Sequence, residues 1–317
     1  MRECDSVARF GGDEFVIILA SLSTSEKAAA NMTEAVVKKI LEALKQAYQI
    51  GHITHHSTAS VGATLFRGNA SPIDELLKQA DLSMYKSKAA GRNTFCFFDP
   101  AMEIAVKERV ALEGDLRLAL KKNQFFLNYQ PQIHGHDRLT GAEVLLRWKH
   151  PERGIVSPAE FIPLAEESGL ILSLGDWVLE TSCKQLAVWA ACPEMAHLSI
   201  AVNVSAVQLR QHDFVGKVIS VLSRTGANPQ RLKLELTESL LVHNVEEIID
   251  KMSLLKARGV GFSLDDFGTG YSSLTYLKRL PLDQLKIDQS FVRDVLIDPN
   301  DAAIAKTIVA LADSLGL

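Results

Sequence analysis

Apolar and polar positions follow two different periods along the second half of the chain. Short runs rich in branched and aromatic residues predict strands, and stretches with apolar residues three or four positions apart predict helices. Strands that alternate with helices in this way indicate a parallel α/β architecture. The expected strands are 125–133, 141–148, 198–204, 231–236, 260–265 and 284–288, and the expected helices lie near 158–168, 173–191, 213–225, 244–258, 271–279 and 300–315.

The first hundred residues show a different order of elements. Two β-prone runs flank Gly11-Gly12-Asp13-Glu14 and predict a hairpin, because paired glycines favour a tight turn. Apolar spacing then predicts helices within 36–48 and 73–90, with a strand at 57–66 between them. Residues 100–123 carry one apolar stripe and read as a helix, either a packed linker or a rod that relays state between domains. We therefore expect a partial first domain at 1–99, a helical linker with the start of the second domain at 100–123, and the rest of the second domain, without its last strands, at 124–317.

Composition narrows the class of protein. The chain has 317 residues, 47% of them hydrophobic and 23% charged, which is typical of a soluble globular protein of two domains. A formal net charge of -4 gives no broad attraction for DNA or RNA. The four cysteines lack disulfide or zinc spacing, and no apolar run is long enough for a membrane segment. We therefore expect a cytoplasmic chain in a reducing compartment, with no nucleic-acid partner.

Oxygen-bearing side chains close several expected strands. They are Glu143, Asn203, Glu235 and the pair Asp265-Asp266. In a β/α barrel the carboxyl ends of the strands meet at one mouth, where the chemistry takes place. Five oxygen donors without a nearby Cys or His cluster favour Mg²⁺ or Mn²⁺ over Zn²⁺. One acid at a strand end is usually a helix cap or a surface charge, so the prediction depends on the joint pattern.

Two basic residues extend this pattern toward phosphate chemistry. Arg147 shares a strand face with Glu143 and can grip a phosphate with two hydrogen bonds. Lys286 lies on one face with Asp288 at the end of the last expected strand. Carboxylates, an amide, a lysine and an arginine together fit the hydrolysis of a phosphodiester assisted by two divalent ions.

A glycine-rich segment follows the two adjacent aspartates. Neighbouring residues of a regular strand face opposite ways, so Asp265 and Asp266 reach one site only if the chain bends there. Gly268 and Gly270 permit such a bend and are suitable hinges for a mobile loop.

The same residues belong to motifs that resemble the EAL family of cyclic-di-GMP phosphodiesterases. The resemblance runs from about residue 109 to the C-terminus and rests on several separate motifs. They are Tyr129-Gln130-Pro131, Glu143-Val144-Leu145-Leu146-Arg147-Trp148, Phe161-Ile162-Pro163-Leu164-Ala165-Glu166, Asn203-Val204-Ser205, Glu235-Leu236-Thr237-Glu238, Asp265-Asp266-Phe267-Gly268-Thr269-Gly270 and Leu285-Lys286-Ile287-Asp288.

This resemblance implies a role for each matching residue. Two Mg²⁺ or Mn²⁺ ions would be bound by Glu143, Asn203, Glu235, Asp265 and Asp266. Cyclic-di-GMP would be contacted by Gln130, Leu145, Arg147 and Asp288. Lys286 would position or activate the attacking water. For Glu238, which the resemblance does not assign, we consider a role as a further metal ligand and favour one in which it orients the glycine-rich loop. The product would be linear pGpG.

The first domain resembles the second half of a GGDEF diguanylate cyclase domain. Gly11-Gly12-Asp13-Glu14-Phe15 matches the signature turn, and the resemblance implies that this turn serves GTP and a metal. Lys88 and Arg92 match the family's phosphate-binding helix end. Arg2 and Asp5 match its RxxD inhibitory site, where cyclic-di-GMP binds.

The chain departs from both family patterns in identifiable places. Val144 replaces the middle alanine of the EAL motif, and we expect its side chain to face away from Glu143. The family's later Glu-Gly-Val-Glu strand and the first half of the cyclase domain are not found in the sequence. The expected fold is therefore a truncated GGDEF domain, a cyclase-like α/β sandwich, plus an incomplete TIM-like (β/α) barrel. The parent protein is expected to be a homodimer, with a membrane anchor in a region that precedes Met1.

Three functions follow from these motifs. The first is a cyclic-di-GMP phosphodiesterase in bacterial second-messenger signalling, based on the complete set of oxygen donors and Lys286. The second is a receptor that binds cyclic-di-GMP without cleaving it, suggested by Val144 and the missing strands. The third is a parent protein that acts mainly as a diguanylate cyclase, suggested by the intact GGDEF turn.

Overall fold

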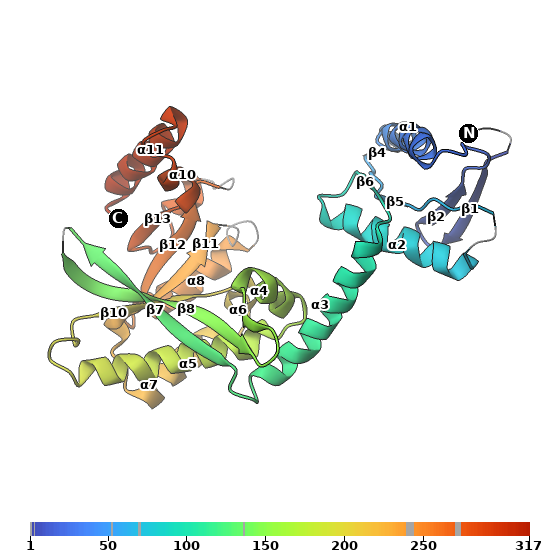
Figure 1. Ribbon diagram of the computed structural model, residues 1–317. Helices are drawn as coiled ribbons and strands as arrows, with labels where there is room; N and C mark the ends of the chain where they lie inside the picture. The colour runs from blue at the N-terminus through green and yellow to red at the C-terminus, as the bar shows by residue number, and fades with distance from the viewer. Residues whose placement is uncertain are drawn as a thin grey trace. The chain divides into compact units, whose positions relative to one another are not determined.

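The computed structural model describes residues 2, 4–51, 53–68, 71–135, 137–238, 244–269 and 274–317. The chain divides into two compact units, Met1–Ala111 and Leu112–Leu317 (Figure 1). Each unit has its own sheets and helices, and the long helix α3, Pro100–Ala119, contains the division between them.

The first unit consists of three small strand pairs and two helices. Strands β1 and β2 are the expected hairpin, and strands β3 and β4 also pair antiparallel, whereas β5 and β6 pair parallel. The strand expected at 57–66 is reduced to the three residues of β5. Gly62 in this strand is required, because a Cβ there would lie 1.9 Å from the Ala80 carbonyl oxygen of α2. The elements are β1 Ser6–Gly11, β2 Glu14–Ile18, α1 Glu26–Leu44, β3 Tyr48–Ile50, β4 Ile53–His55, β5 Val61–Ala63, α2 Ile73–Ala89 and β6 Phe95–Phe97.

The second unit is built on a seven-stranded sheet with the order β13-β12-β11-β10-β8-β7, to which β9 adds beside β8. Strands β8, β10, β11, β12 and β13 are parallel, as expected. The prediction that 125–133 is a parallel strand was wrong, because β7 pairs antiparallel with β8. Only residues 135–137 separate these two strands, too few for a parallel crossover. The strands are β7 Phe125–His134, β8 Arg138–His150, β9 Gly154–Val156, β10 Ser199–Asn203, β11 Leu232–Thr237, β12 Gly261–Phe267 and β13 Gln284–Ile287.

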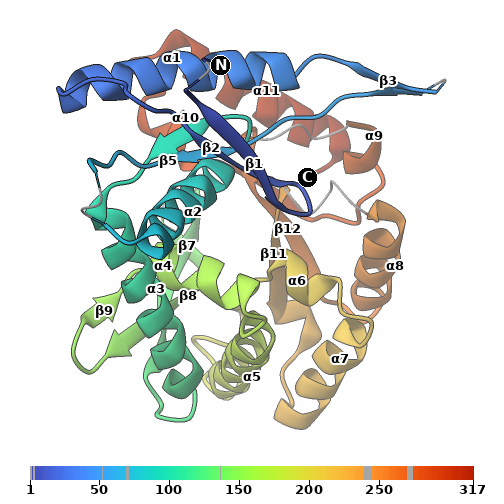
Figure 2. The same ribbon diagram turned by 90° about the vertical axis from the view of Figure 1, so that its right-hand side faces the viewer.

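Helices cover the apolar face of this sheet. Leu232, Leu234 and Leu236 alternate along β11 and are buried in one cluster with Val218 of α7 and Met252 of α8. Figure 2 shows α7 and α8 on the outer side of β11 and β12. Of the helix expected at 271–279, the described part is α9, Leu274–Leu277, which ends two residues earlier than expected; residues 270–273 lie outside the described residues. The helices are α4 Pro158–Glu167, α5 Ile171–Ala190, α6 Ala206–Leu209, α7 Phe214–Thr225, α8 Val245–Lys256, α9, α10 Gln289–Arg293 and α11 Pro299–Leu315, with a 3₁₀ turn at Pro229–Arg231.

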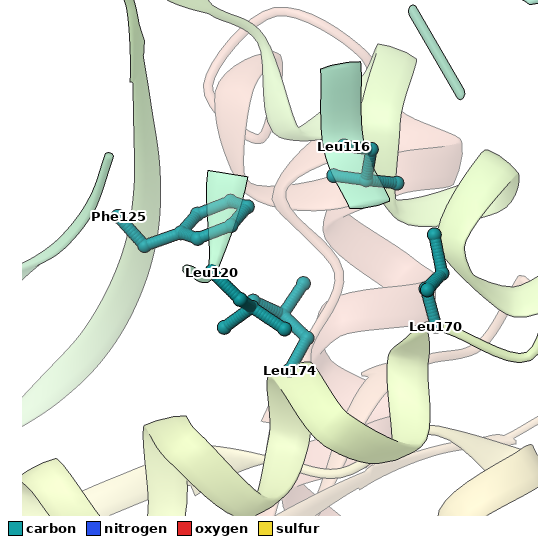
Figure 3. A pocket seen from close by; sticks show the side chains of 5 residues that line it. All are labelled: Leu116, Leu120, Phe125, Leu170 and Leu174. Carbon is teal, nitrogen blue, oxygen red and sulfur yellow. The ribbon is translucent and has the colours of Figure 1, made fainter. Parts of the chain in front are cut away.

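The end of α3 belongs to the core of the second unit. Its residues Leu112, Leu116 and Ala119 are buried in a cluster that includes Trp148 of β8. Figure 3 shows Leu116 and Leu120 of the α3 end pointing toward Phe125, Leu170 and Leu174 around a small apolar pocket. The apolar stripe predicted in 100–123 is therefore a packing surface.

None of the helices in the described ranges is both long and apolar enough to cross a membrane.

Candidate active site

The predicted site residues lie on one face of the parallel sheet. Paired residues on neighbouring strands share a face, and Glu143 pairs with Ala201 while Asn203 pairs with Glu235. Asp265 pairs with Thr237, two residues beyond Glu235. From β8 to β10, and again from β11 to β12, the cluster therefore moves two residues further along the strand, whereas from β10 to β11 it stays level. This stepwise shift is the register stagger of strands in a barrel. The opposite face of the same strands supplies the buried apolar residues that pack against helices.

Lys286 brings three of the acidic side chains together. Its Nζ lies 2.9 Å from Glu143 Oε2, 2.8 Å from Glu235 Oε2 and 2.7 Å from Asp265 Oδ2. Each contact is a charge-assisted hydrogen bond, which is stronger than a hydrogen bond between neutral groups. One ammonium group thus offsets part of the negative charge of three converging carboxylates.

The three carboxylates form a group of the right size for a metal ion. One oxygen from each of Glu143, Glu235 and Asp265 lies within 4.8 Å of the others. Asn203 Nδ2 donates to Glu143 Oε1 over 2.8 Å, so its amide joins the same cluster. Glu235 is 1% exposed, and its Oε1 is buried without a hydrogen-bond partner in the described part of the chain. A buried carboxylate oxygen without a partner is costly, and a bound cation would satisfy it.

The environment shifts the protonation of this cluster. Burial raises the pKa of Glu235 to about 7, although the hydrogen bond and charge of Lys286 oppose this shift. Burial alone lowers the pKa of Lys286, but its hydrogen bonds to Asp265, Glu235 and Glu143 outweigh burial and raise the pKa above its ordinary value. Lys286 therefore stays protonated at neutral pH, while the carboxyl group of Glu235 is close to half protonated there.

Asp266 occupies a bend in the chain. Its φ of 53° is in the left-handed region, and the β12–β13 pairing is irregular between Leu264 and Phe267. The bend turns Asp266 away from the regular strand path, as expected for two adjacent acids at a strand end. Burial, Asp265 and Asp288 raise the pKa of Asp266. Asp266 is thus electrostatically coupled to the cluster, although it is not one of the three carboxylates that Lys286 contacts.

Asp288 has a structural role at the start of α10. Its Oδ1 accepts hydrogen bonds from the backbone N–H and the hydroxyl group of Ser290, so it caps that helix. These hydrogen bonds lower the pKa of Asp288. Its predicted contact with the dinucleotide remains a prediction.

Glu238 lies at the end of β11 and holds the segment that follows β12. Its Oε2 accepts a hydrogen bond of 3.1 Å from the backbone N–H of Gly268. Gly268 has a φ of 104°, which favours glycine. The link matches the orienting role expected for Glu238, while the hinge expected at Gly270 lies outside the described residues.

Three of the four residues expected to contact the dinucleotide lie beside Glu143. Gln130 of β7 pairs directly with Glu143, and Leu145 and Arg147 follow Glu143 on the same face of β8. Arg147 Nη1 donates to the Leu146 carbonyl oxygen over 2.9 Å. Val144 is 3% exposed and packs in the apolar core, so the change from alanine faces away from Glu143 as expected.

Sequence reasoning missed a polar layer beneath the acidic cluster. Lys233 precedes Glu235 by two residues on β11, and its Nζ donates to Gln284 Oε1 over 2.7 Å. Ser263, which pairs with both Glu235 and Gln284, has a buried hydroxyl without a partner among the described residues. Burial lowers the pKa of Lys233. The sequence did contain a sign of this layer. Residues two apart on a strand share a face, so Lys233 could have been placed on the same face of β11 as Glu235.

The residues predicted in the first unit keep their expected local positions. Gly11 pairs with Glu14 across the β1–β2 turn, and Gly12 has a φ of 52°. Asp13 is exposed at the same turn. Lys88 lies in the last turn of α2, and Arg92 follows with a φ of 61°.

Arg2 and Asp5 are hydrogen-bonded to each other. The backbone N–H of Arg2 donates to Asp5 Oδ2 over 2.7 Å, and the Arg2 guanidinium lies 3.4 Å from Asp5 Oδ1. The hydrogen bond from the Arg2 backbone is the largest cause that lowers the pKa of Asp5. The two RxxD residues thus form one local unit.

Comparison with known families identifies the class of protein. The EAL domain family matches residues 113–317, and the family described as "Diguanylate cyclase, GGDEF domain" matches residues 1–94. The chain therefore belongs to the EAL domain family, and its first part is a GGDEF sequence. EAL domains are metal-dependent, and the acidic cluster lies within the matched residues.

Curated relatives match the chain over nearly its whole length. The chain is 42% identical over its whole length to the bifunctional diguanylate cyclase/cyclic di-GMP phosphodiesterase MucR of Pseudomonas aeruginosa, and covers 45% of that protein. It is 38% identical over 98% of its length to the cyclic di-GMP phosphodiesterase PdeR of Escherichia coli, and covers 46% of it. The chain thus spans less than half the length of these curated relatives.

Solved structures support the same fold. The structure titled "PaMucR Phosphodiesterase, c-di-GMP complex" is 45% identical with a TM-score of 0.63, over 65% of this chain and 84% of that one. The EAL enzyme Bd1971, in its form bound to cAMP and cyclic-di-GMP, is 30% identical with a TM-score of 0.64, over 78% of this chain and 65% of that one.

Proposed function

We propose that the EAL unit hydrolyses cyclic-di-GMP to linear pGpG with the help of two Mg²⁺ or Mn²⁺ ions. The observation that carries this proposal is the convergence of Glu143, Glu235 and Asp265 around Lys286. The names of the relatives, which include two cyclic di-GMP phosphodiesterases, support the choice of substrate.

The donor set fits the proposed metal ions. Carboxylate and amide oxygens are the ligands that Mg²⁺ and Mn²⁺ prefer, and the buried Oε1 of Glu235, which has no hydrogen-bond partner among the described residues, is suited to bind a cation. Glu143, Asn203, Glu235, Asp265 and Asp266 would hold the ions. When bound, such ions polarise a phosphodiester and lower the pKa of water.

The protein's own residues would bind and orient the substrate. Arg147 would bind two oxygens of one phosphate with two parallel hydrogen bonds, and Gln130 would contact the dinucleotide beside Glu143. Lys286, protonated at neutral pH, would hold the attacking water by donating a hydrogen bond to its oxygen. Glu238 would keep the backbone at Gly268 in place over the site.

Turnover of cyclic-di-GMP by the full-length protein tests the proposal. We expect pGpG to accumulate with Mg²⁺ or Mn²⁺ and not with excess chelator. Tight binding of cyclic-di-GMP in the presence of the metals, with the ligand intact after long incubation, would instead establish a receptor. Lys286→Met is the matched inactive control, because it removes the ammonium group and keeps the length of the side chain.

A second candidate function, the synthesis of cyclic-di-GMP, rests on the hairpin of the first unit. Its turn is exposed and has the positive φ at Gly12 that brings backbone near a ligand. We propose that GTP and a metal bind at Gly11, Gly12, Asp13 and Glu14, with Lys88 and Arg92 toward the phosphates, and that Arg2 and Asp5 bind product. Formation of cyclic-di-GMP from GTP by the full-length protein, and its loss in Asp13→Ala, is the test.

A further inference from the structure

Lys233 is a partly buried cation in an unusual position. It lies on the inner face of β11, two residues before Glu235, between Ala201 of β10 and Gly261 of β12 in the register of the sheet. Within the described residues no carboxylate lies within 4.0 Å of its ammonium group, and its hydrogen bond goes to the neutral side chain of Gln284. Glu235 and Asp283 attract this charge only from a distance, and a partly buried charge without a close ion-pair partner costs stability, so its presence calls for a role.

The contact with Gln284 passes over one complete strand. Lys233 belongs to β11 and Gln284 to β13, with β12 between them in the sheet. Gly261 is the residue of β12 that pairs with Lys233, so no side chain of β12 lies beside the lysine at that level of the sheet. The lysine side chain therefore ties two strands that share no backbone hydrogen bonds.

Strand β13 needs such a tie because its own pairing is weak. It is four residues long, lies at the end of the sheet in the described part of the chain, and pairs irregularly with β12 beyond Leu264. Gln284 and Lys286 share one face of this strand. Holding the side chain of Gln284 in place therefore also fixes the position along the strand from which the side chain of Lys286 reaches the acidic cluster.

We infer that Lys233, acting through Gln284, is a positioning residue that sets the location of the Lys286 ammonium group for phosphodiester hydrolysis. The expected effect on catalysis rests on the proposed function. The placement of Lys286 by Lys233 and Gln284 does not, because it depends only on contacts within this chain. Lys233 itself touches neither substrate nor the reacting atoms.

The test compares Lys233→Met with Lys286→Met and the double variant in the full-length protein. Misplacement of a catalytic group by about 1 Å can cost about 100-fold, so we expect Lys233→Met to lower kcat between about 10- and 100-fold. KM and the affinity for Mn²⁺ by calorimetry should stay within about twofold of the unmodified protein. Because Lys233 acts through Lys286, the double variant should be no slower than Lys286→Met alone.

Two further variants separate positioning from general damage. Lys233→Arg keeps a donor and a charge and should recover most of kcat, and Gln284→Met should reproduce the loss from the other end of the contact. Lys217→Met, on the exposed surface of α7, is the matched control and should leave kcat unchanged. The inference would be overturned if Lys233→Met weakened Mn²⁺ binding and raised KM as much as it lowered kcat. It would also be overturned if the fold-losses in kcat of the two single variants multiplied in the double variant.

A spectroscopic readout keeps the inference testable even if the enzyme proves inactive. The ¹⁵N signal of Lys286 Nζ, assigned by its loss in Lys286→Arg, should shift in Lys233→Met and in Gln284→Met but not in Lys217→Met. An unshifted signal in both variants would refute the positioning role, whereas absent turnover with a shifted signal would refute only the proposed function.

Discussion

Lys286 Nζ and Glu143 Oε2 are 2.9 Å apart although their strands are four positions apart in the sheet. On a flat sheet, four steps of about 4.8 Å would separate the two backbones by roughly 19 Å, beyond the reach of the two side chains. The contact therefore requires a strongly curled sheet. The curl, more than any single residue, brings the acidic cluster together.

Glu235 should make the metal-free protein sensitive to pH. Its pKa is about 7 in the folded chain against an ordinary value of 4.5, so its proton favours the folded state. That stabilisation is complete below pH 4.5 and disappears as the pH rises through 7, with a total on the order of 3 kcal/mol. In excess chelator, the unfolding free energy of the unmodified protein minus that of Glu235→Gln should fall over this range. A difference that stays constant from pH 4 to 8 would contradict this origin.

Divalent ions should reverse that loss of stability. Mn²⁺ or Mg²⁺ at about 100 times its Kd should stabilise the folded chain by about 2.7 kcal/mol, because it binds the assembled carboxylates and not the unfolded chain. Thermal unfolding at pH 8 with and without the ion measures the effect. Glu143→Gln should reduce the shift in Tm, and Glu194→Gln, an exposed acid outside the cluster, should not. Equal shifts in both variants would place the ion elsewhere.

Asp266→Asn should separate stability from activity. Asparagine adopts the left-handed φ of 53° as readily as aspartate, and the change removes a negative charge beside Asp265 and Asp288. The unfolding free energy should therefore change by no more than about 0.5 kcal/mol. Turnover should fall at least about 100-fold if Asp266 holds a metal. Retained turnover would remove Asp266 from the proposed ligand set.

Glu238 should affect the rate more than the fold. Glu238→Ala leaves the Gly268 N–H without its acceptor and should lower kcat about tenfold or more, whereas Glu238→Gln keeps an oxygen acceptor and should lose less. Steady-state kinetics of the two variants make the comparison. Equal losses would mean that the negative charge, and not the hydrogen bond, is what matters.

Leu116 and Leu118 provide a matched pair for the packing of α3. Leu116 is 2% exposed in the core of the second unit and Leu118 is 46% exposed. Leu116→Ala should cost about 2–5 kcal/mol of unfolding free energy, and Leu118→Ala much less. Denaturant unfolding followed by the fluorescence of Trp148, which lies in the same cluster, measures both. Similar costs at the two positions would mean that α3 does not pack as described.

Hydrophobic periodicity predicted most of the second unit, because buried strands and amphipathic helices both leave a local pattern. It misassigned the direction of β7, since strand direction depends on the length of the connection and not on the strand's own residues. In the first unit only Val61–Ala63 of the expected strand 57–66 pairs, because a β-prone run becomes a strand only where a partner backbone lies beside it.

The acidic cluster was predictable because its members lie on one face of strands that a barrel brings together, but Glu143 lies inside β8, Arg138–His150, and not at a strand end as expected. The contact between Lys233 and Gln284 was not, because it depends on how far β13 is staggered against β11. Likewise, the sequence did not show that Asp288 caps α10, since a capping aspartate and a ligand look alike in a motif.

Helix α3 runs across the boundary between the two units, because its residues Leu112, Leu116 and Ala119 complete the interior of the second unit. An excised second domain that begins at residue 124 would leave these side chains behind and expose Trp148 and Phe125 to water. A recombinant fragment should therefore begin upstream of Leu112, and the choice of that first residue will determine whether the isolated domain is soluble.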